Sequence, residues 1–309
     1  MYRYILSRIL QALVTIVIVS IVVFSLSAFS GNPALLMLGP DASNEDIAAM
    51  EKRLGTDKPI PVQYWNWAKH AITGDLGDSI QLKRPVKDLI RERLPNSLQL
   101  GAVTFGFSVV IALVLGTVAG VMRGSFVDFI VRFFTNIGHA APSFWVAIVA
   151  ISIFAVRFDI LPAAGKGDWK TFVLPAVTLG MATIAGMMRL LRSSMIEVLA
   201  SDYVRVARAK GLEPRVVILR HAIRNALLPL ITVAGLLLAT IVTGSVIAET
   251  IFAWPGIGLL GFRAIQEHDF PVIQGVVLIG AVTIAFANLV VDILYGYIDP
   301  RIRLHRSAS

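Results

Sequence analysis

The 309-residue sequence is 56% hydrophobic and only 16% charged, and its formal net charge is +8. Soluble proteins of average composition carry about a quarter charged residues, so this composition excludes an ordinary soluble enzyme or binding domain. The sequence also contains no cysteine, which excludes disulfides, iron–sulfur clusters and a thiol nucleophile.

Long apolar runs without Asp, Glu, Lys or Arg recur along the chain, and each is 17 to 24 residues long. About 20 apolar residues are needed to cross roughly 30 Å of hydrocarbon, and a soluble core does not need six helices of this kind. The sequence therefore predicts an all-α integral membrane protein with six transmembrane helices. The predicted spans are residues 9–29, 100–122, 133–156, 172–188, 226–248 and 272–291.

The first run, 9–29, has the position of a secretory signal but not its length. Its 21 apolar residues exceed the roughly 7–15 of a signal core, and five more spans follow. We therefore expect residues 1–29 to form an N-terminal tail and a retained first helix.

Basic residues are distributed unequally between the two sides of the membrane that six spans define. With the N-terminus inside, 15 of the 28 Lys and Arg residues fall on the inner side and only four in the short outer loops. The segment 30–99 holds the other nine, and long segments cross membranes largely regardless of charge. This asymmetry predicts that both termini, including the tail 299–309, are cytoplasmic. The positive net charge therefore does not indicate nucleic-acid binding.

Between the first two spans, residues 30–99 are amphipathic, which predicts a helical cap outside the membrane. Its three expected helices cover residues 43–55, 62–72 and 84–95. Ser43 and Asp46 have the spacing of a capping box, and Gly55 is suited to end the first helix. The aromatic stripe of the second helix is expected to pack locally or at the membrane interface.

Small residues and prolines mark several of the expected spans. GTVAG (116–120), in the second span, has the small-xxx-small spacing that permits close contact between helices. Prolines lie in the third, fourth and fifth spans, where they indicate kinks around a pathway or simple packing. These prolines are Pro142, Pro175 and Pro229.

The sequence contains no recognisable catalytic or metal site. GKGDWK (165–170) lacks the GxxxxGK[ST] spacing of a phosphate loop, so the chain is not expected to hydrolyse ATP by that route. The five histidines are scattered; His139 is expected to be a packing residue, and EHD (267–269) a solvated turn. We therefore predict no catalytic residue, no metal site and no cofactor bound by this chain.

The longest cytoplasmic segment, 189–225, holds eight basic and three acidic residues. Asp202 is expected to cap a short helix within it, and Gly211 to end that helix. One face of the helix is expected to combine Val206, Ala207 and Lys210. Such a helix suits docking into the groove of a partner, but a basic segment can also serve only to fix topology and to contact anionic lipid. Composition alone leaves both interpretations open.

Two segments, DYVRVARAKG (202–211) and HAIRNALLP (221–229), together resemble the cytoplasmic loop signature of permease subunits of binding-protein-dependent ABC importers. The separation of 18 residues between Gly211 and Pro229 is similar to the peptide/nickel branch of that superfamily. Further segments with this resemblance follow in order along nearly the whole chain: residues 54–67, 74–80, 84–86, 252–258, 269–274 and 289–303.

Two departures from the pattern of the superfamily are visible. Asn32 stands where the branch often has an acidic residue, which puts a polar role of that position in doubt. Arg205, Val206 and Ala207 replace the Glu-Ala-Ala of the superfamily, as is usual within the branch.

The resemblance implies a mechanism as well as a fold. Two similar six-span subunits, usually non-identical, form a pathway through the lipid of a bacterial inner membrane, and residues 100–298 would be the transmembrane domain. A coupling helix of each subunit docks on an ATPase subunit that binds ATP and Mg²⁺, and a solute-binding protein delivers the cargo outside. Carried over to this sequence, the docking residues are Asp202, Tyr203, Arg205, Ala207, Arg208, Lys210 and Gly211. The anchors to the fifth span are Arg224, Asn225 and Pro229.

The leading hypothesis is a permease subunit that forms half of the pathway for short peptides. The same branch carries nickel, metal–chelator complexes and glutathione, so the cargo stays open. An ion-coupled carrier is disfavoured, because such carriers place chains of Asp, Glu or His within the membrane. Here the expected spans contain only His139. A membrane scaffold without a pathway is the third hypothesis.

Overall fold

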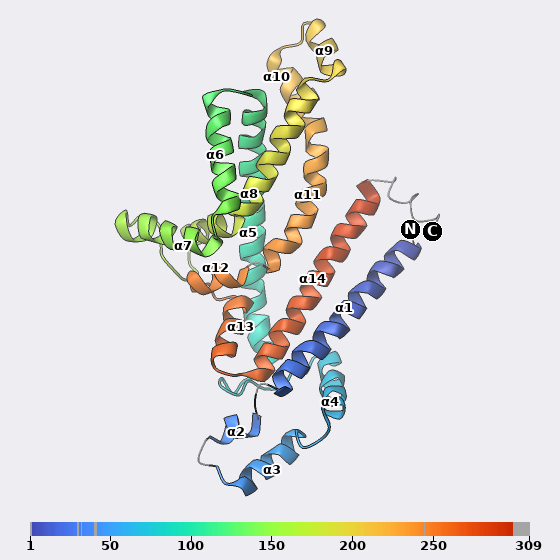
Figure 1. The fold of residues 1–309 in the computed structure, drawn as a ribbon, viewed down its shortest axis with the longest axis vertical. Helices are drawn as coiled ribbons and strands as arrows, with labels where there is room; N and C mark the ends of the chain where they lie inside the picture. The colour runs from blue at the N-terminus through green and yellow to red at the C-terminus, as the bar shows by residue number, and fades with distance from the viewer. Residues whose placement is uncertain (1, 30, 32, 40–41, 244, 299–309) are drawn as a thin grey trace. The chain divides into compact units, whose positions relative to one another are not determined.

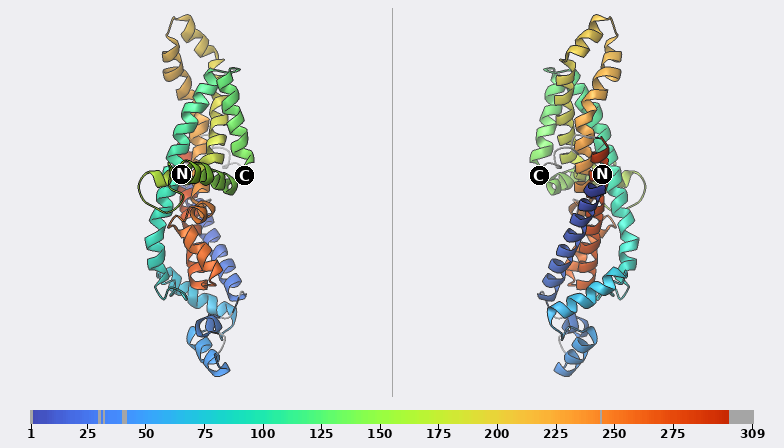
Figure 2. Two further views of the ribbon diagram at one scale, coloured as in Figure 1. Left: turned by 90° about the vertical axis from the view of Figure 1, so that its left-hand side faces the viewer. Right: turned by 90° about the vertical axis from the view of Figure 1, so that its right-hand side faces the viewer.

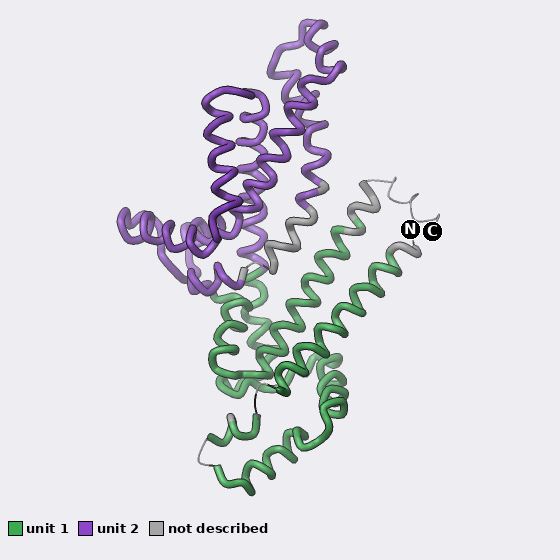
Figure 3. Tube along the Cα trace, in the orientation of Figure 1, with its two compact units in different colours: residues 1–97, 255–309 green, residues 98–254 purple. Residues whose placement is uncertain are grey.

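The structure is a computed structural model of the 309-residue chain, and it describes all residues except 1, 30, 32, 40–41, 244 and 299–309. Asn32 and the predicted tail therefore lie outside the described residues. The described elements are all helices, and the single extended pairing found among them is an isolated bridge between Asp78 and Pro85. They form two compact units: unit 1, residues 1–97 with 255–309, and unit 2, residues 98–254 (Figures 1 and 3).

Unit 1 is built on two helices, α1 (Tyr2–Phe29) and α14 (Phe270–Ile298), which lie side by side (Figure 2). They are antiparallel, since Leu26 near the end of α1 shares a groove with Phe270 at the start of α14. The other elements of unit 1 are α2 (Pro33–Leu38), α3 (Asn44–Leu54), α4 (Ile60–Ile72), the first turns of α5 (Val86–Val121) and α13 (Ile257–Gln266).

The helices predicted over 43–55 and 62–72 are confirmed as helices by α3 and α4, and their place in a cap outside the membrane stays a prediction. Ser43 precedes α3 and accepts a hydrogen bond from the backbone N–H three residues on, at 3.1 Å, and Gly55 ends the helix with φ of +73°. On α4, the rings of Tyr64 and Trp67 lie 5.6 and 5.5 Å from the ring of Phe24 on α1. These two aromatic side chains therefore pack locally, as expected.

The third predicted cap helix is wrong as a separate element. A helix over 84–95 and a span over 100–122 are expected, but α5 runs through both without interruption. Pro95 lies inside α5 without ending it. A proline removes only one backbone hydrogen bond, so a helix can continue through it when the flanking turns keep theirs. One helix therefore combines polar first turns with apolar later turns.

Unit 2 is organised around α8 (Lys170–Leu199), which contacts α6 (Phe126–Ala140), α7 (Ser143–Ala150) and α11 (Ile223–Thr243). The remainder of α5 also belongs to this unit. Its other elements are η1 (Ile151–Arg157), α9 (Asp202–Ala209), α10 (Pro214–Val216), η2 (Val217–Ala222) and α12 (Ser245–Ile251).

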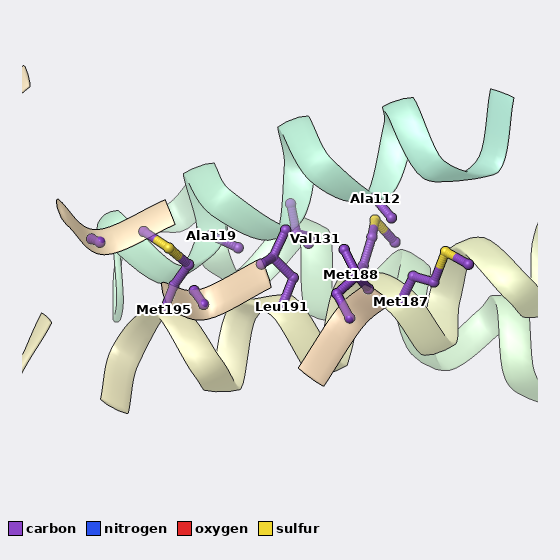
Figure 4. Close-up of a cluster of buried hydrophobic side chains, with 10 residues drawn as sticks. Ala112, Ala119, Val131, Met187, Met188, Leu191 and Met195 are labelled. Carbon is purple, nitrogen blue, oxygen red and sulfur yellow. The ribbon is translucent and has the colours of Figure 1, made fainter. Parts of the chain in front are cut away.

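The core of unit 2 joins long side chains of α8 to small residues of its neighbours. Met188, Leu191 and Met195 of α8 pack near Ala112 and Ala119 of α5 (Figure 4). The two glycines of GTVAG face the same helix, where added side chains would have a Cβ 3.1 Å from that of Leu191 and 2.5 Å from that of Met195. The prediction of close helix contact at 116–120 is confirmed.

The predicted third span, 133–156, is not one straight helix: it bends at Pro142, where a kink is one of the two expected roles of the proline. The helix α6 and the pair formed by α7 and η1 meet at 114°. Ala141 has an extended backbone (φ −78°, ψ 127°), and Pro142 immediately precedes α7. A residue before proline is disfavoured in the helical conformation, so the chain breaks here. Pro175 and Pro229, in contrast, lie inside α8 and α11 without ending them.

Four described helices are long and apolar enough to cross a membrane, and the bent pair makes a fifth if it counts as one span. The four are Ile5–Phe29, Val86–Val121, Lys170–Leu199 and Phe270–Val291. The predicted span 226–248 covers α11 and part of α12, and residue 244 between these helices lies outside the described residues. The structure has the helices of a multi-pass membrane protein, and the count of six spans stays a prediction.

Candidate functional site

The predicted coupling segment folds as a short helix, α9, that ends in a left-handed turn. Ser201 precedes the helix with an extended backbone (φ −70°, ψ 154°), and Asp202 is its first residue. The prediction that Asp202 caps the helix is therefore wrong; its carboxylate instead pairs with Arg205 at 2.5 Å. Gly211 has φ of +78°, a region that favours glycine, and the helix ends there as predicted.

The buried face of α9 differs from the one that the sequence predicts. Val204 and Ala207 are three residues apart, share a face and pack with Val217. Ala207 is only 7% exposed, so its side chain lies on the buried face of α9, and its role in docking stays a prediction. Val206, expected on the same face as Ala207, is 52% exposed.

The outward side of α9 and its turn combines apolar and basic side chains. Tyr203 and Val206 are large exposed hydrophobic residues at its centre. Three basic residues and the terminal glycine surround them and are exposed as well. This α9 surface consists of Tyr203, Arg205, Val206, Arg208, Lys210 and Gly211.

Asn225, near the start of α11, contacts α9 directly. Its Nδ2 donates one hydrogen bond to Oη of Tyr203 at 3.0 Å and another to the backbone oxygen of His221 at 3.0 Å. The structure therefore joins the α9 surface to the helix in which the fifth predicted span begins. Arg224 is exposed beside Asn225, and Pro229 lies within α11. The anchoring roles of Arg224 and Pro229 stay predictions.

Sequence reasoning misses an ion pair on α8, the helix that leads into α9. Nε of Arg192 donates to Oδ1 of Asp128 at 2.5 Å, and Nη2 donates to Oδ2 at 2.9 Å. The Asp128 side chain is 1% exposed and also accepts the backbone N–H of Gly124 at 3.0 Å. The spacing of Ser125 and Asp128 indicates the start of a helix, but no local signal connects position 128 with position 192.

A second missed arrangement lies in unit 1, where Asp269 is buried at 2% exposure. Ser79 Oγ donates to its carboxylate at 2.5 Å, and the backbone N–H groups of Ile80 and Gln81 donate at 3.2 Å each. These four residues form what we call the Asp269 knot. The prediction of a solvated turn at 267–269 is wrong for Asp269, because the carboxylate is enclosed by donors from a distant loop.

The other ionisable groups of note are His139, with its neighbour Arg189, and any cluster that could bind a metal ion. His139, expected to be a packing residue, has its Nε2 2.9 Å from Nη2 of Arg189, and both residues are exposed or half-buried. Among the described residues, no three or more of His, Asp and Glu gather where they could hold a metal ion. The candidate functional features are therefore the exposed α9 surface and the two buried polar contacts, Asp128–Arg192 and the Asp269 knot.

Two family models match successive parts of the chain. The model described as "Binding-protein-dependent transport system inner membrane component" covers residues 112–304. The model described as "Binding-prot-dependent transport system membrane comp, N-term" covers residues 1–101. Together they span most of the sequence, and the first includes α9, α11 and both residues of the Asp128–Arg192 pair.

Named relatives and solved structures agree with these matches. The glutathione transport system permease protein GsiC of Salmonella choleraesuis (strain SC-B67) is 37% identical over 304 residues, which is 98% of this chain and 99% of the relative. GsiC of Escherichia coli (strain K12) is 36% identical over the same coverage. The MetNI methionine ABC transporter in an inward-facing conformation has a TM-score of 0.56 at 19% identity, over 68% of this chain and 96% of that chain.

At 19% identity the structural likeness shows the fold alone. The family models and the GsiC relatives establish more, because they cover nearly the whole chain. The chain belongs to the family of inner membrane components of binding-protein-dependent transport systems: it is a multi-pass permease of an ABC importer in the dipeptide, oligopeptide and nickel branch, and is not itself catalytic.

Proposed function

We propose that this chain forms half of the translocation pathway of an ATP-driven importer, beside a second, non-identical permease subunit. Two ATPase subunits bind ATP and Mg²⁺, and one of them docks on the α9 surface of this chain. A solute-binding protein delivers the cargo. The chain crosses the membrane six times, with both termini in the cytoplasm and residues 30–99 outside. The observation that carries the docking assignment is the exposure of Tyr203 and Val206 among basic side chains.

The contacts of α9 suit it to pass a displacement, caused by a bound partner, on to α11. Exposed apolar residues with a polar rim are the usual composition of a specific protein contact. The packing of Val204 and Ala207 on Val217 holds α9 against its own loop. The hydrogen bond from Asn225 to Tyr203 then links the contact surface to α11. A displacement of α9 would therefore move the end of a membrane helix.

Short peptides are the proposed cargo, and glutathione is the specific candidate. The identity of 37% to a glutathione transport system permease supports glutathione, which is itself a tripeptide and fits a peptide pathway. Nickel and metal–chelator complexes are the alternatives within the branch. Uptake by a deletion strain carrying the complete transporter, tested with glutathione, dipeptides, oligopeptides, nickel and nickel chelates, separates these cargoes.

Docking is tested with the double variant Gly211→Val and Arg208→Glu. A β-branched residue is strained at the φ of Gly211, and the second change reverses a charge of the α9 surface. Membrane insertion should persist, while co-purification with the ATPases and uptake should both be lost. Arg123→Glu is the matched control, because it reverses an exposed charge outside α9. Normal uptake by the double variant would sink the docking assignment.

Topology is tested separately with single cysteines, since the native chain has none. A cysteine at Lys58 in the cap should react with a membrane-impermeant thiol reagent in intact cells stripped of the outer membrane. A cysteine at Arg208 should react only after the inner membrane is opened. The opposite pattern would reverse the orientation, and uptake by this chain alone under an ion gradient would favour a secondary carrier.

A further inference from the structure

Asp128 and Arg192 form a charge pair that the α9 surface does not include. The carboxylate is almost completely buried and meets the guanidinium in a two-bond fork. Arg132 lies 3.6 Å away as a second, more exposed cation. A forked Arg–carboxylate contact fixes direction as well as distance, which a single charge contact does not.

The pair lies where three helices of unit 2 meet: the end of α5, the start of α6 and the middle of α8. Asp128 lies in the first turn of α6, and its carboxylate accepts the N–H of Gly124 in the turn that follows α5. A Cβ at Gly120 would lie 3.2 Å from the backbone oxygen of Arg192, so the backbone of α5 also contacts α8 there. The helices α5, α6 and α8 are therefore joined around one arginine.

This junction lies close to the coupling segment along the same helix. From Arg192, α8 continues seven residues to Leu199, which is about 10 Å of helix. Val198 and Leu199 at its end pack against Val204 and Ala207 of α9. The end of α8 therefore connects α9 with the Asp128–Arg192 junction.

We propose that Asp128 and Arg192 are positioning residues that transmit the displacement of α9 to α6 and to α7 and η1, which follow it. This inference rests on the proposed docking of α9 to an ATPase. Without the fork, the start of α6 would no longer be fixed to Arg192 on α8, and ATP hydrolysis would no longer be converted into opening of the pathway. The expected defect is thus a loss of coupling, with hydrolysis retained.

Two substitutions alter the charge and the fork. Asp128→Asn keeps the shape and leaves one oxygen that can accept the N–H of Gly124, but it removes the charge and one of the two acceptors of the fork. Arg192→Lys keeps the charge and removes the two-bond geometry. Arg189→Gln is the matched control, because Arg189 lies three residues earlier on α8 and contacts His139 instead of a carboxylate.

The experiment uses the complete transporter in proteoliposomes and measures cargo taken up per ATP hydrolysed. For Asp128→Asn and Arg192→Lys this ratio should fall about tenfold, a typical size for a coupling between sites. Co-purification with the ATPases should be normal, and Arg189→Gln should match the wild type. The double variant should be no worse than either single change, because the two residues act as one unit.

Three results would overturn the inference. The first is an unchanged ratio in both variants. The second is a parallel loss of uptake, hydrolysis and folded complex, which indicates a role in stability alone. The third is the same loss in Arg189→Gln. Should Asp128→Asn not assemble, the ratio for Arg192→Lys decides. Failure of the docking proposal itself gives a different result, because the α9 double variant would then co-purify and transport normally.

Discussion

The α9 turn (residues 202–211) and the Asp269 knot both lie in segments that carry the family resemblance, yet they hold a carboxylate in opposite ways. The side chain of Asp202 is 90% exposed and pairs with an arginine that is also exposed. Asp269 is buried and accepts hydrogen bonds from Ser79 and from two backbone N–H groups nearly 190 residues away in sequence. The α9 turn leaves its charged side chains exposed to solvent, whereas the Asp269 knot buries its carboxylate in hydrogen bonds within the chain.

This difference indicates that the carboxylates of the two segments have different roles in this chain. A buried carboxylate with several donors closes a loop, and its loss leaves those donors without partners. An exposed pair contributes little to stability, because water and salt screen it. Substitutions in the Asp269 knot should therefore lower the free energy of unfolding, whereas charge reversals on the α9 surface should change transport with little effect on unfolding.

The largest effect is expected for Asp269→Ala. The hydroxyl of Ser79 and the N–H groups of Ile80 and Gln81 lose their common acceptor, which should lower the free energy of unfolding by about 3 kcal/mol. Denaturation of the purified protein in detergent measures this loss. Asp78→Asn is the control, because Asp78 is exposed in the same loop. Equal stability of the two variants would remove the contrast between the knot and the α9 turn.

The second-largest loss of stability is expected for a substitution at the apolar contact between α5 and α8. Gly120→Ala places a Cβ 2.5 Å from that of Met195, so α5 and α8 must separate, at a cost of about 2 kcal/mol. Gly106→Ala on the same helix meets nothing within 4 Å and should be neutral or stabilising. Thermal denaturation of the pair tests this, and a similar melting temperature for both would contradict the close contact.

The helices could largely be predicted from the sequence because their signals are local. Ser43 and Gly55 mark the ends of α3, and the left-handed Gly211 marks the end of the α9 turn. The break at Pro142 and the continuity through Pro95 were not distinguishable in this way. A proline removes the same N–H in both places, and only the neighbouring turns decide whether the helix continues.

The site was predictable in position but not in its contacts. The segment 202–211 was found from charge and resemblance, and α9 forms within it. Which face of α9 is buried depends on Val217, beyond the helix, whereas the sequence alone groups the buried Ala207 with the exposed Val206. The pairing of Asp128 with Arg192 is not predictable for the same reason: the two residues are 64 positions apart in sequence, and only the packing of α6 on α8 brings them together.

A smaller effect is expected where the α9 turn meets α11. Asn225→Ala and Tyr203→Phe each remove the side-chain hydrogen bond of 3.0 Å, and because both residues are exposed the cost should be about 0.5 kcal/mol. Uptake should fall more than stability does. A double-mutant cycle measures the coupling of the two residues. Strictly additive losses of uptake would show that this bond does not link α9 to α11.

The smallest effect on unfolding is expected for Asp202→Asn. The carboxylate is exposed and its partner Arg205 is exposed as well, so the melting temperature in detergent should not change. Uptake should stay within about twofold of the wild type, since a screened charge pair contributes little to a contact. Arg208→Glu, which reverses a charge of the α9 surface, is the comparison and should abolish uptake at the same melting temperature. A lower melting temperature for Asp202→Asn would mean that the α9 turn, like the Asp269 knot, uses its carboxylate to hold the chain together.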